Sequence, residues 1–391
     1  MKQLFIVMIF LPLLGNSQIK DTKLISKMDG TFLSEDGIYT PFWGFGEFNP
    51  TLPNQRISLP SPLLIYDLND SVYLKLHNLS PEMHTIHLHG LDVTQINDGV
   101  PSTSFGVLFN DSATYKFKAK HPGTYLYHCH VQTNLHAAMG MYGMLVIRNY
   151  PDTNLLYNNG PSFNKEYFYL SSDMYLYWNF NVTSPGPFHM YEADYFMING
   201  KAGSQLFDDT TQIINMSAGD TALLHIGNVG YNSVEYVFPS EANAVIHMSD
   251  GRVLPNPIDS DTLILYPGER YSVLLSPAQF IQGHITVNSA NLYNTETIVG
   301  TNYIGINIDS LGQGMEDNKL AYLNLYPNPT STNLQIQSKE TLDIYIYNLE
   351  GKLFEIFSIK PGINNLDVST FAKGLYMVGA IGYLPAKFII E

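Results

Sequence analysis

Residues 122–147 read PGTYLYHCHVQTNLHAAMGMYGMLVI. The stretch opens with a Pro-Gly turn signal, alternates aromatic and polar side chains from Thr124 to His130, and ends in an apolar run from Gly143 to Ile147. Period-2 runs of this length, bounded by proline and glycine, are typical of β-strands. Runs of the same kind lie at 63–76 and 113–119, so this part of the chain predicts a β-sandwich.

The composition supports a β-rich chain that does not bind nucleic acid. Aromatic residues make up 13% and charged residues 14% of the 391 residues, and no stretch has the spacing of a long amphipathic helix. The formal net charge of −15 would repel both nucleic acid and an anionic membrane surface. These two classes of partner are therefore excluded.

The first 17 residues have the pattern of a signal peptide. Lys2 supplies a positive flank, the apolar stretch from Leu4 to Leu14 is too short to span a bilayer, and Gly-Asn-Ser at 15–17 forms a small-residue cleavage site. Exported proteins normally pair their cysteines, yet Cys129 is the only cysteine. A lone cysteine in an oxidising compartment is either buried and inert or held by a metal, so its neighbours decide its role.

Turn and linker signals divide the rest of the chain into three folded segments. The first covers residues 28–150, and the second covers 157–309, where short strands recur with a similar rhythm. The polar stretch LGQGMEDN at 311–318 is a linker to a third segment at 319–391. We predict an all-β chain of sandwiches.

Six of the twelve histidines lie in two short stretches around the lone cysteine. Residues 84–90 read HTIHLHG, and residues 127–130 read YHCH and are followed by His136. A blue copper centre requires two imidazoles, one thiolate and a weak axial thioether. One set of residues supplies this inventory, with Met139 as the competing candidate for the axial position: His84, Cys129, His136 and Met141.

Strand geometry directs the other histidines to a different face. In an extended chain, His128 and His130 point away from the side chain of Cys129. His87 and His89 are also two residues apart and share a face. The segment therefore offers two His-x-His pairs to a second metal site, joined to the first through the backbone. The remaining histidines are interpreted as surface or core residues: His77, His121, His189, His225, His247 and His284.

The sequence around these ligands resembles the N-terminal cupredoxin domain of the multicopper oxidase family. The matching stretches are HLHGLDV at 87–93, DGVP at 98–101, PGTYLYH at 122–128 and GMYGMLVI at 140–147. That domain usually lacks blue copper. The cysteine loop of this chain is instead similar to the family's C-terminal copper domain and to copper nitrite reductases.

The resemblance implies roles for the second set of histidines. His87 would bind a type 2 copper, and His89, His128 and His130 would bind a type 3 pair. Asp98 resembles an acidic residue that assists proton delivery to the copper cluster, although a simple Asp-Gly turn explains it nearly as well.

The later segments carry resemblances of their own. INGKA at 198–202 and PGERYSV at 267–273 are similar to the copper-free middle domain of three-domain oxidases, and no ligand pairs stand in this segment. LYPNP at 325–329 and KGLYMV at 373–378 resemble the C-terminal sorting domain of type IX secretion substrates. These likenesses imply two cupredoxin-like Greek-key β-sandwiches and a small Ig-like sandwich. They also imply export through the periplasm and outer membrane, by the type IX machinery, to the medium or the cell surface.

The number of ligands implies an oligomer. The family's trinuclear cluster uses eight histidines, whereas this chain supplies four. A partner subunit would complete the cluster, for example across a two-fold axis, which suggests a homo-oligomer (dimer or trimer). The implied activity is that of a copper oxidoreductase, which passes electrons from a small reducing substrate or metal ion to dioxygen.

Two other functions remain open. A non-enzymatic cupredoxin would carry electrons or bind copper, with the extra histidines as a sink. A copper nitrite reductase is disfavoured, because those enzymes place a catalytic aspartate where this chain has His87, and they lack a histidine at the position of His130.

Overall fold

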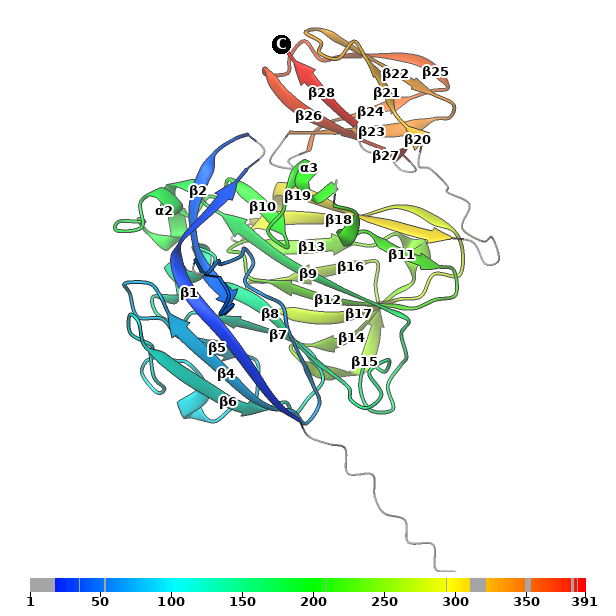
Figure 1. Ribbon diagram of the computed structural model, residues 1–391. Coiled ribbons are helices and arrows are strands. Elements are labelled where there is room, and N and C mark those ends of the chain that lie inside the picture. The colour runs from blue at the N-terminus through cyan, green and yellow to red at the C-terminus, as the bar shows by residue number, and fades with distance from the viewer. Residues whose placement is uncertain are drawn as a thin grey trace, which may run out of the picture.

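Figure 1 shows the computed structural model, which describes residues 18–309 apart from 35, 53, 208 and 293, and residues 321–391 apart from 349–352, 381–382 and 385. The expected signal peptide and the linker at 311–318 lie outside the described residues. The predicted all-β class is confirmed, since strands account for about 53% of the described residues and helices for 8%.

The N-terminal sandwich consists of two four-stranded sheets. The first has the order β2 (Tyr39–Glu47), β1 (Ile19–Leu33), β4 (Ser71–Asn78) and β6 (Ser112–Lys118). The second has the order β3 (Leu64–Asp67), β8 (Tyr142–Arg148), β7 (Gly123–His128) and β5 (His87–His89). Aromatic and aliphatic side chains of both sheets fill the space between them, and Cys129 and Met141 lie in the same core.

The run at 63–76 forms two strands in different sheets. β3 ends at Asp67 and β4 begins at Ser71, because Asn69 adopts a left-handed turn conformation with φ of 72°. The carboxylate of Asp70 accepts a hydrogen bond from the Asp67 amide and holds this turn. Polar residues inside an alternating run therefore mark a change of sheet here.

The second sandwich is larger. Its six-stranded sheet has the order β10 (Tyr195–Ile198), β9 (Lys165–Met174), β12 (Ala222–Asn228), β17 (Arg270–Leu275), β14 (Ala244–Ser249) and β15 (Arg252–Asp259). Its five-stranded sheet has the order β11 (Ile214–Ser217), β19 (Asn294–Asp309), β18 (Ile281–Asn291), β13 (Ser233–Val237) and β16 (Thr262–Leu265). Aliphatic side chains from both sheets form its core.

The few helices are short and lie in connections. Two of them matter for the site, since α1 carries a predicted ligand and η1 precedes Asp98. The helices are α1 (Thr133–Ala138), α2 (Leu176–Phe180), α3 (Gly203–Phe207), η1 (Gln95–Asn97), η2 (Phe188–Met190), η3 (Thr210–Gln212) and η4 (Ser240–Ala242). No helix of the described residues is both long enough and apolar enough to span a membrane.

The second sandwich packs on the outer face of β7 and β8, so both faces of these strands are buried. Leu126, Met144 and Val146 point outward from them and form a small apolar cluster with Leu170 of β9. The segment with α2 and η2 adds Trp178, which joins the core of the N-terminal sandwich. Two-sided burial explains why β8 reads as an almost continuous apolar run.

A buried polar group joins the two sandwiches at this interface. Thr124 Oγ1 lies 2.6 Å from His225 Nδ1, and His225 Nε2 donates to the Glu166 carboxylate at 3.0 Å. The Arg148 guanidinium also donates to Glu166, from Nε at 3.0 Å. Burial by itself raises the pKa of Glu166, but the hydrogen bonds from His225 and Arg148 outweigh it, and the pKa lies below its ordinary value.

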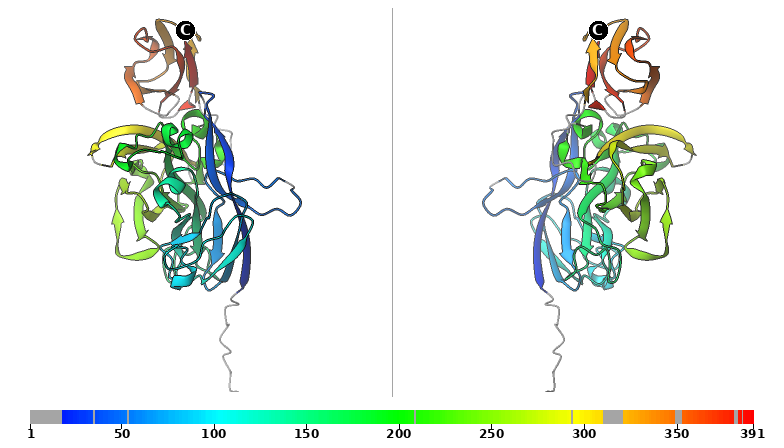
Figure 2. Two further views of the ribbon diagram at one scale, coloured as in Figure 1. Left: turned by 90° about the vertical axis from the view of Figure 1, so that its left-hand side faces the viewer. Right: turned by 90° about the vertical axis from the view of Figure 1, so that its right-hand side faces the viewer.

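The C-terminal sandwich is small and separate in sequence. Its three-stranded sheet has the order β21 (Asn324–Tyr326), β22 (Asn333–Ser338) and β25 (Gly362–Asp367). Its four-stranded sheet has the order β24 (Leu353–Ile359), β23 (Leu342–Tyr347), β26 (Gly374–Gly379) and β28 (Ala386–Ile390). The short strands β20 (Ala321–Tyr322) and β27 (Tyr383–Leu384) pair with each other. Figure 2 shows this sandwich at one end of the molecule. The ring of Tyr347 in this sandwich packs against the ring of Tyr303 in β19.

The Glu166 group yields a stability prediction. Glu166→Gln should lower the free energy of unfolding at pH 7 by about 1–3 kcal/mol, because a charged acceptor of buried donors is lost. A carboxylate with a lowered pKa stabilises the fold above its ordinary pKa of 4.5, and this contribution is lost as the pH falls below that value. The gap between wild type and variant should therefore shrink under acid.

Urea unfolding at several pH values measures this gap. The exposed Glu241→Gln is the control and should change little at any pH. Equal stability of wild type and E166Q at pH 7 would contradict the assigned role of Glu166.

Candidate metal centre

Cys129 lies directly after the last residue of β7 and is fully buried. Its sulfur lies 3.2 Å from Nδ1 of His136 and 3.6 Å from Nδ1 of His84. The three donor atoms all lie within 4.8 Å of one another. Burial raises the pKa of the free thiol to about 11, so this position favours a thiolate only when a cation binds it.

The backbone holds the three ligands together. His84 precedes β5 and forms an isolated antiparallel β-bridge with Val107. The amide of each of the two residues donates a hydrogen bond to the carbonyl of the other. His136 lies in α1, which starts after Gln132 in a left-handed conformation. The loop closes on itself, since the amide of Met141 donates to the His136 carbonyl and the amide of Cys129 donates to the Met141 carbonyl, both at 3.0 Å.

Both imidazoles of this group are kept neutral by their surroundings. Burial lowers the pKa of His84 to about 3 and that of His136 to about 4. Trp43 packs edge-on against the His136 ring, with 5.2 Å between ring centroids. Neutral imidazoles whose Nδ1 atoms converge on a buried sulfur suit a metal ion as the group they bind.

Two methionines near this group are fully buried, Met139 and Met141. The peptide groups of Met141 bond directly to those of Cys129 and His136, whereas the Met139 carbonyl accepts the amide of Trp43. This connection favours Met141 as the thioether donor. Two imidazole nitrogens, one thiolate and one thioether in an apolar site fit a blue copper ion.

A second group of histidines lies on the opposite side of β7. Ring nitrogens of His87, His89 and His128 lie within 4.8 Å of one another. Nδ1 of His89 is 3.3 Å from Nε2 of His128. The ring of His130 lies beside that of His87, with 5.1 Å between centroids. We call His87, His89, His128 and His130 the histidine cluster; its members come from β5 and from the end of β7.

Burial also favours the neutral form of two members of the histidine cluster. Burial, which is the main cause, lowers the pKa of His89 to about 4 and that of His128 to about 3. His87 donates from Nδ1 to the carbonyl of Asp98 at 2.7 Å, which leaves its Nε2 free for a metal. His128 donates from Nδ1 to the carbonyl of Cys129 at 3.0 Å, so its Nε2, which faces Nδ1 of His89, is the nitrogen without a proton.

Asp98 lies in a turn next to the histidine cluster. It follows η1 and precedes Gly99, which has a φ of +73°. A side chain at Gly99 would collide with the carbonyl of Ile86, so the turn requires glycine. The turn places Asp98 next to His87, and the Asp98 carboxylate lies 3.3 Å from Nδ1 of His87. The carboxylate is partly exposed and thus connects the cluster with solvent.

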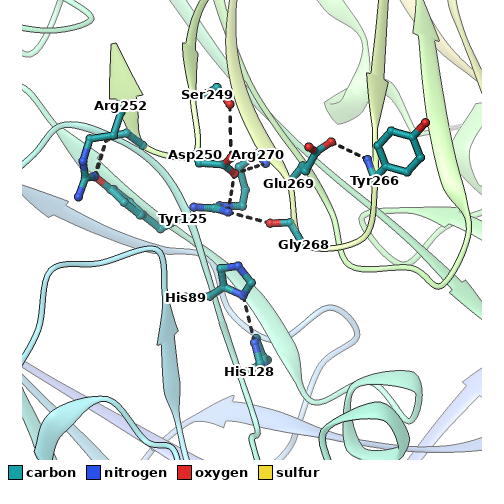
Figure 3. Close-up of polar contacts among 11 residues, drawn as sticks. His89, Tyr125, His128, Ser249, Asp250, Arg252, Tyr266, Gly268, Glu269 and Arg270 are labelled. Atoms are coloured by element: carbon teal, nitrogen blue, oxygen red, sulfur yellow. Dashed lines mark hydrogen bonds and ion pairs between the residues drawn. The ribbon is translucent and has the colours of Figure 1, made fainter. Parts of the chain in front are cut away.

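Three neighbours of the ligands were not found by sequence reasoning. The Glu82 carboxylate lies 3.5 Å from Nε2 of His136, and Thr85 Oγ1 accepts the His130 amide at 3.0 Å. Arg270 of the second sandwich lies beside His89 (Figure 3). Glu82 and Thr85 flank His84 in the sequence, which was a usable signal. Nothing in the sequence linked Arg270 to a site in another sandwich.

The remaining histidines have other partners. His121 lies 3.0 Å from the Asp92 carboxylate, His225 belongs to the interface group, and His284 packs edge-on against Tyr303. Metal-sized groups of three or more ligands are found only at the two places described above, within the part of the chain that the structure describes.

Comparisons with known proteins agree with this class of copper-binding β-sandwich. Residues 54–152 and 165–305 each match the family described as "Multicopper oxidase", and together they span more than half of the chain. Residues 324–382 match "Secretion system C-terminal sorting domain". The chain therefore belongs to the multicopper oxidase family, whose cofactor is copper, and it carries a secretion sorting domain.

Individual relatives are more distant. The copper-containing nitrite reductase of Neisseria meningitidis serogroup B is 27% identical over 215 residues, which cover 53% of this chain and 49% of that protein. Copper resistance protein A of Escherichia coli is 40% identical over 90 residues, which cover 23% of this chain and 14% of that protein. The chain thus spans about half, or less, of the length of these curated relatives.

Among solved structures, the blue copper oxidase from Nitrosomonas europaea is similar over 77% of this chain and 89% of that chain. The TM-score is 0.59 and the identity is 26%. This likeness supports the arrangement of the two large sandwiches.

The buried thiol gives a spectroscopic prediction. Cys129→Ser should abolish the intense visible absorption of the copper-loaded protein, because this band requires a copper–thiolate bond. Visible absorption together with copper analysis measures the loss. His77→Ala, at a histidine bonded to Ser112 outside both groups, should keep the band. A blue C129S protein would refute the ligand assignment.

The axial ligand gives a separate prediction. Met141→Leu should raise the reduction potential of the blue copper, since removing a weak thioether donor destabilises the oxidised ion. Met139→Leu should leave the potential unchanged. Redox titration of the visible band distinguishes the two, and a shift seen only in M139L would transfer the axial role to Met139.

Proposed function

We propose that the protein is an exported copper oxidase. A small reducing substrate or metal ion gives up single electrons at the Cys129 site, and dioxygen is reduced at the histidine cluster. The observation that carries this proposal is the sequence His128-Cys129-His130, whose alternating side chains reach both sites from one strand end.

Copper bound at both places would supply the redox chemistry, and the chain supplies the connection. The Cys129 carbonyl accepts the hydrogen bond of His128, so one peptide unit touches both groups. Thr85 fixes the amide of His130, the residue after the thiol. Because these contacts are covalent or hydrogen-bonded and buried, the two sites are held at a fixed separation.

Electrons would enter near Glu82. Its carboxylate is about half exposed and lies next to Nε2 of the buried His136. The side-chain amide of Asn78 holds the Glu82 carbonyl. A carboxylate at this place can attract a metal cation or accept the proton that a hydroxyl-bearing donor releases on oxidation. Asp98 would serve the other end of the reaction by bringing solvent protons to the cluster beside His87.

A partner subunit would complete the cluster. His87, His89, His128 and His130 provide half of the ligands of a trinuclear site, and all four side chains keep some exposure. A homo-oligomer, either a dimer or a trimer, could bring a second set against the first.

Export follows from the sorting domain at residues 324–382. We infer a route through the periplasm, guided by the signal peptide, and then through the outer membrane by the type IX machinery. The protein would act in the medium or at the cell surface.

Nitrite reduction is the second candidate, because nitrite reductases are among the relatives. His87 occupies the position of their catalytic aspartate, and His130 has no counterpart there, so dioxygen reduction remains the preferred proposal. A third candidate, a cupredoxin without enzymatic activity, would show the blue band but no turnover. Oxygen uptake with a phenolic dye, compared with nitrite-dependent turnover, separates all three.

The proposal predicts the behaviour of His87→Ala. This variant should keep the blue band but lose most of its non-blue copper and its oxygen uptake, because only the histidine cluster is damaged. Copper analysis, absorption and an oxygen electrode measure these properties, with His77→Ala as the control.

Analytical ultracentrifugation of the same samples tests the oligomer. We expect an oligomer with more than one copper per chain. A monomer with a single copper per chain would rule out the completed cluster and leave the electron carrier as the function.

A further inference from the structure

Arg270 begins β17 of the second sandwich and is 3% exposed. Figure 3 shows its guanidinium above the imidazole of His89, across the boundary between the two sandwiches. Its Nη1 donates to the Asp250 carboxylate at 2.6 Å and to the Gly268 carbonyl at 2.7 Å. The second sandwich, which brings no ligands of its own, thus places a positive charge beside the histidine cluster.

Two of the three nitrogens of this guanidinium lack partners. Nε and Nη2 of Arg270 are buried and have no hydrogen-bond partner among the described residues. Buried N–H groups of an arginine are nearly always bonded, and an unpaired one signals an ion or water that belongs there. The unpaired Nη2 lies against Gly90, the residue that follows His89.

Two glycines make this close approach possible. A side chain at Gly90 would collide with Nη2 of Arg270, since its Cβ would lie 2.2 Å away. Gly268 lies against the His89 ring, where a Cβ would be 3.2 Å from Cε1. Both have φ near +90°, a conformation that glycine adopts without strain. The backbone is thus shaped to bring the guanidinium against the ligand strand.

Without a metal, the charge of Arg270 is balanced by the carboxylate of Asp250. The carboxylate partner Asp250 is about half exposed, whereas the guanidinium is buried. A copper ion on the neighbouring imidazoles would add more positive charge at short range. Two buried cations repel each other at low dielectric, so an anion between the guanidinium and the metal would stabilise a loaded cluster.

We propose that Arg270 is the anion-binding group of the histidine cluster. Its free N–H groups would hold a small monoanion next to a metal ion bound by His87, His89 and His128. This role rests on the proposed function, because it requires copper at the cluster. It assigns to the copper-free sandwich a direct part in ligand binding at the site.

Arg252 provides a matched control at the same interface. It binds the Asp92 carboxylate through Nη2 at 2.8 Å, and through Nη1 it binds the Tyr125 hydroxyl and the Gly251 carbonyl. It also bridges the two sandwiches and is about half exposed. Figure 3 places it on the other side of Tyr125 from Arg270. A loss of interface contacts alone should therefore affect both arginine variants.

The test is a titration of the copper-loaded protein with azide, followed through the azide-to-copper absorption band. Arg270→Met should weaken azide binding by at least about tenfold, because a charged hydrogen-bond donor is lost. Arg270→Lys keeps the charge without the planar fork and should lie between R270M and wild type. Arg252→Met should bind azide as wild type does. The blue band and the copper content of each variant show whether its fold and metal sites are intact.

The outcomes separate the two proposals. Azide affinity equal to wild type in a fully loaded R270M protein would overturn the role of Arg270 and leave the oxidase proposal standing. An equal loss of azide affinity in R252M and R270M would mean that Arg270 acts only as an interface contact. A wild-type chain that loads copper only at the blue site would overturn both the anion site and the proposed oxidase.

Discussion

The alternation of side chains at the end of β7 is the constraint on which the site depends. Successive residues of an extended chain point to opposite faces, so Cys129 enters the core while its two histidine neighbours point outward. The inner face is closed by His84, His136 and Met141, and the outer face by His87 and His89 of the paired strand β5. A shift of one residue in the register of β7 would exchange the faces and destroy both groups.

Burial on two sides makes this strand end rigid. The N-terminal core covers the thiol face, and the second sandwich covers the opposite face through Leu126 and Leu170. Burial lowers the pKa of His84, His89, His128 and His136 and so favours their neutral form, which is the form that binds metals. The second sandwich thus shapes the surroundings of the histidine cluster, although none of its described residues belongs to either group of ligands.

Much of this could be predicted from the sequence, because the informative residues are close together. The His-x-His pairs, the lone cysteine and the loop to Met141 form a short pattern whose spacing reflects local strand and loop geometry. The all-β class was equally accessible from the alternating runs. The division of residues 63–76 between two sheets was not, since the turn at Asn69 depends on which sheet each half joins. Arg270 was also beyond reach, because a contact across two sandwiches leaves no local pattern.

The central claim is that one sulfur and two imidazole nitrogens bind a single copper ion in the N-terminal sandwich. X-ray absorption at the copper edge measures this directly, in protein loaded with one equivalent of copper. The account predicts a short bond to one sulfur, with two imidazole nitrogens in the same shell. A spectrum explained by nitrogen and oxygen ligands alone would contradict it, because the ion would then be held away from Cys129.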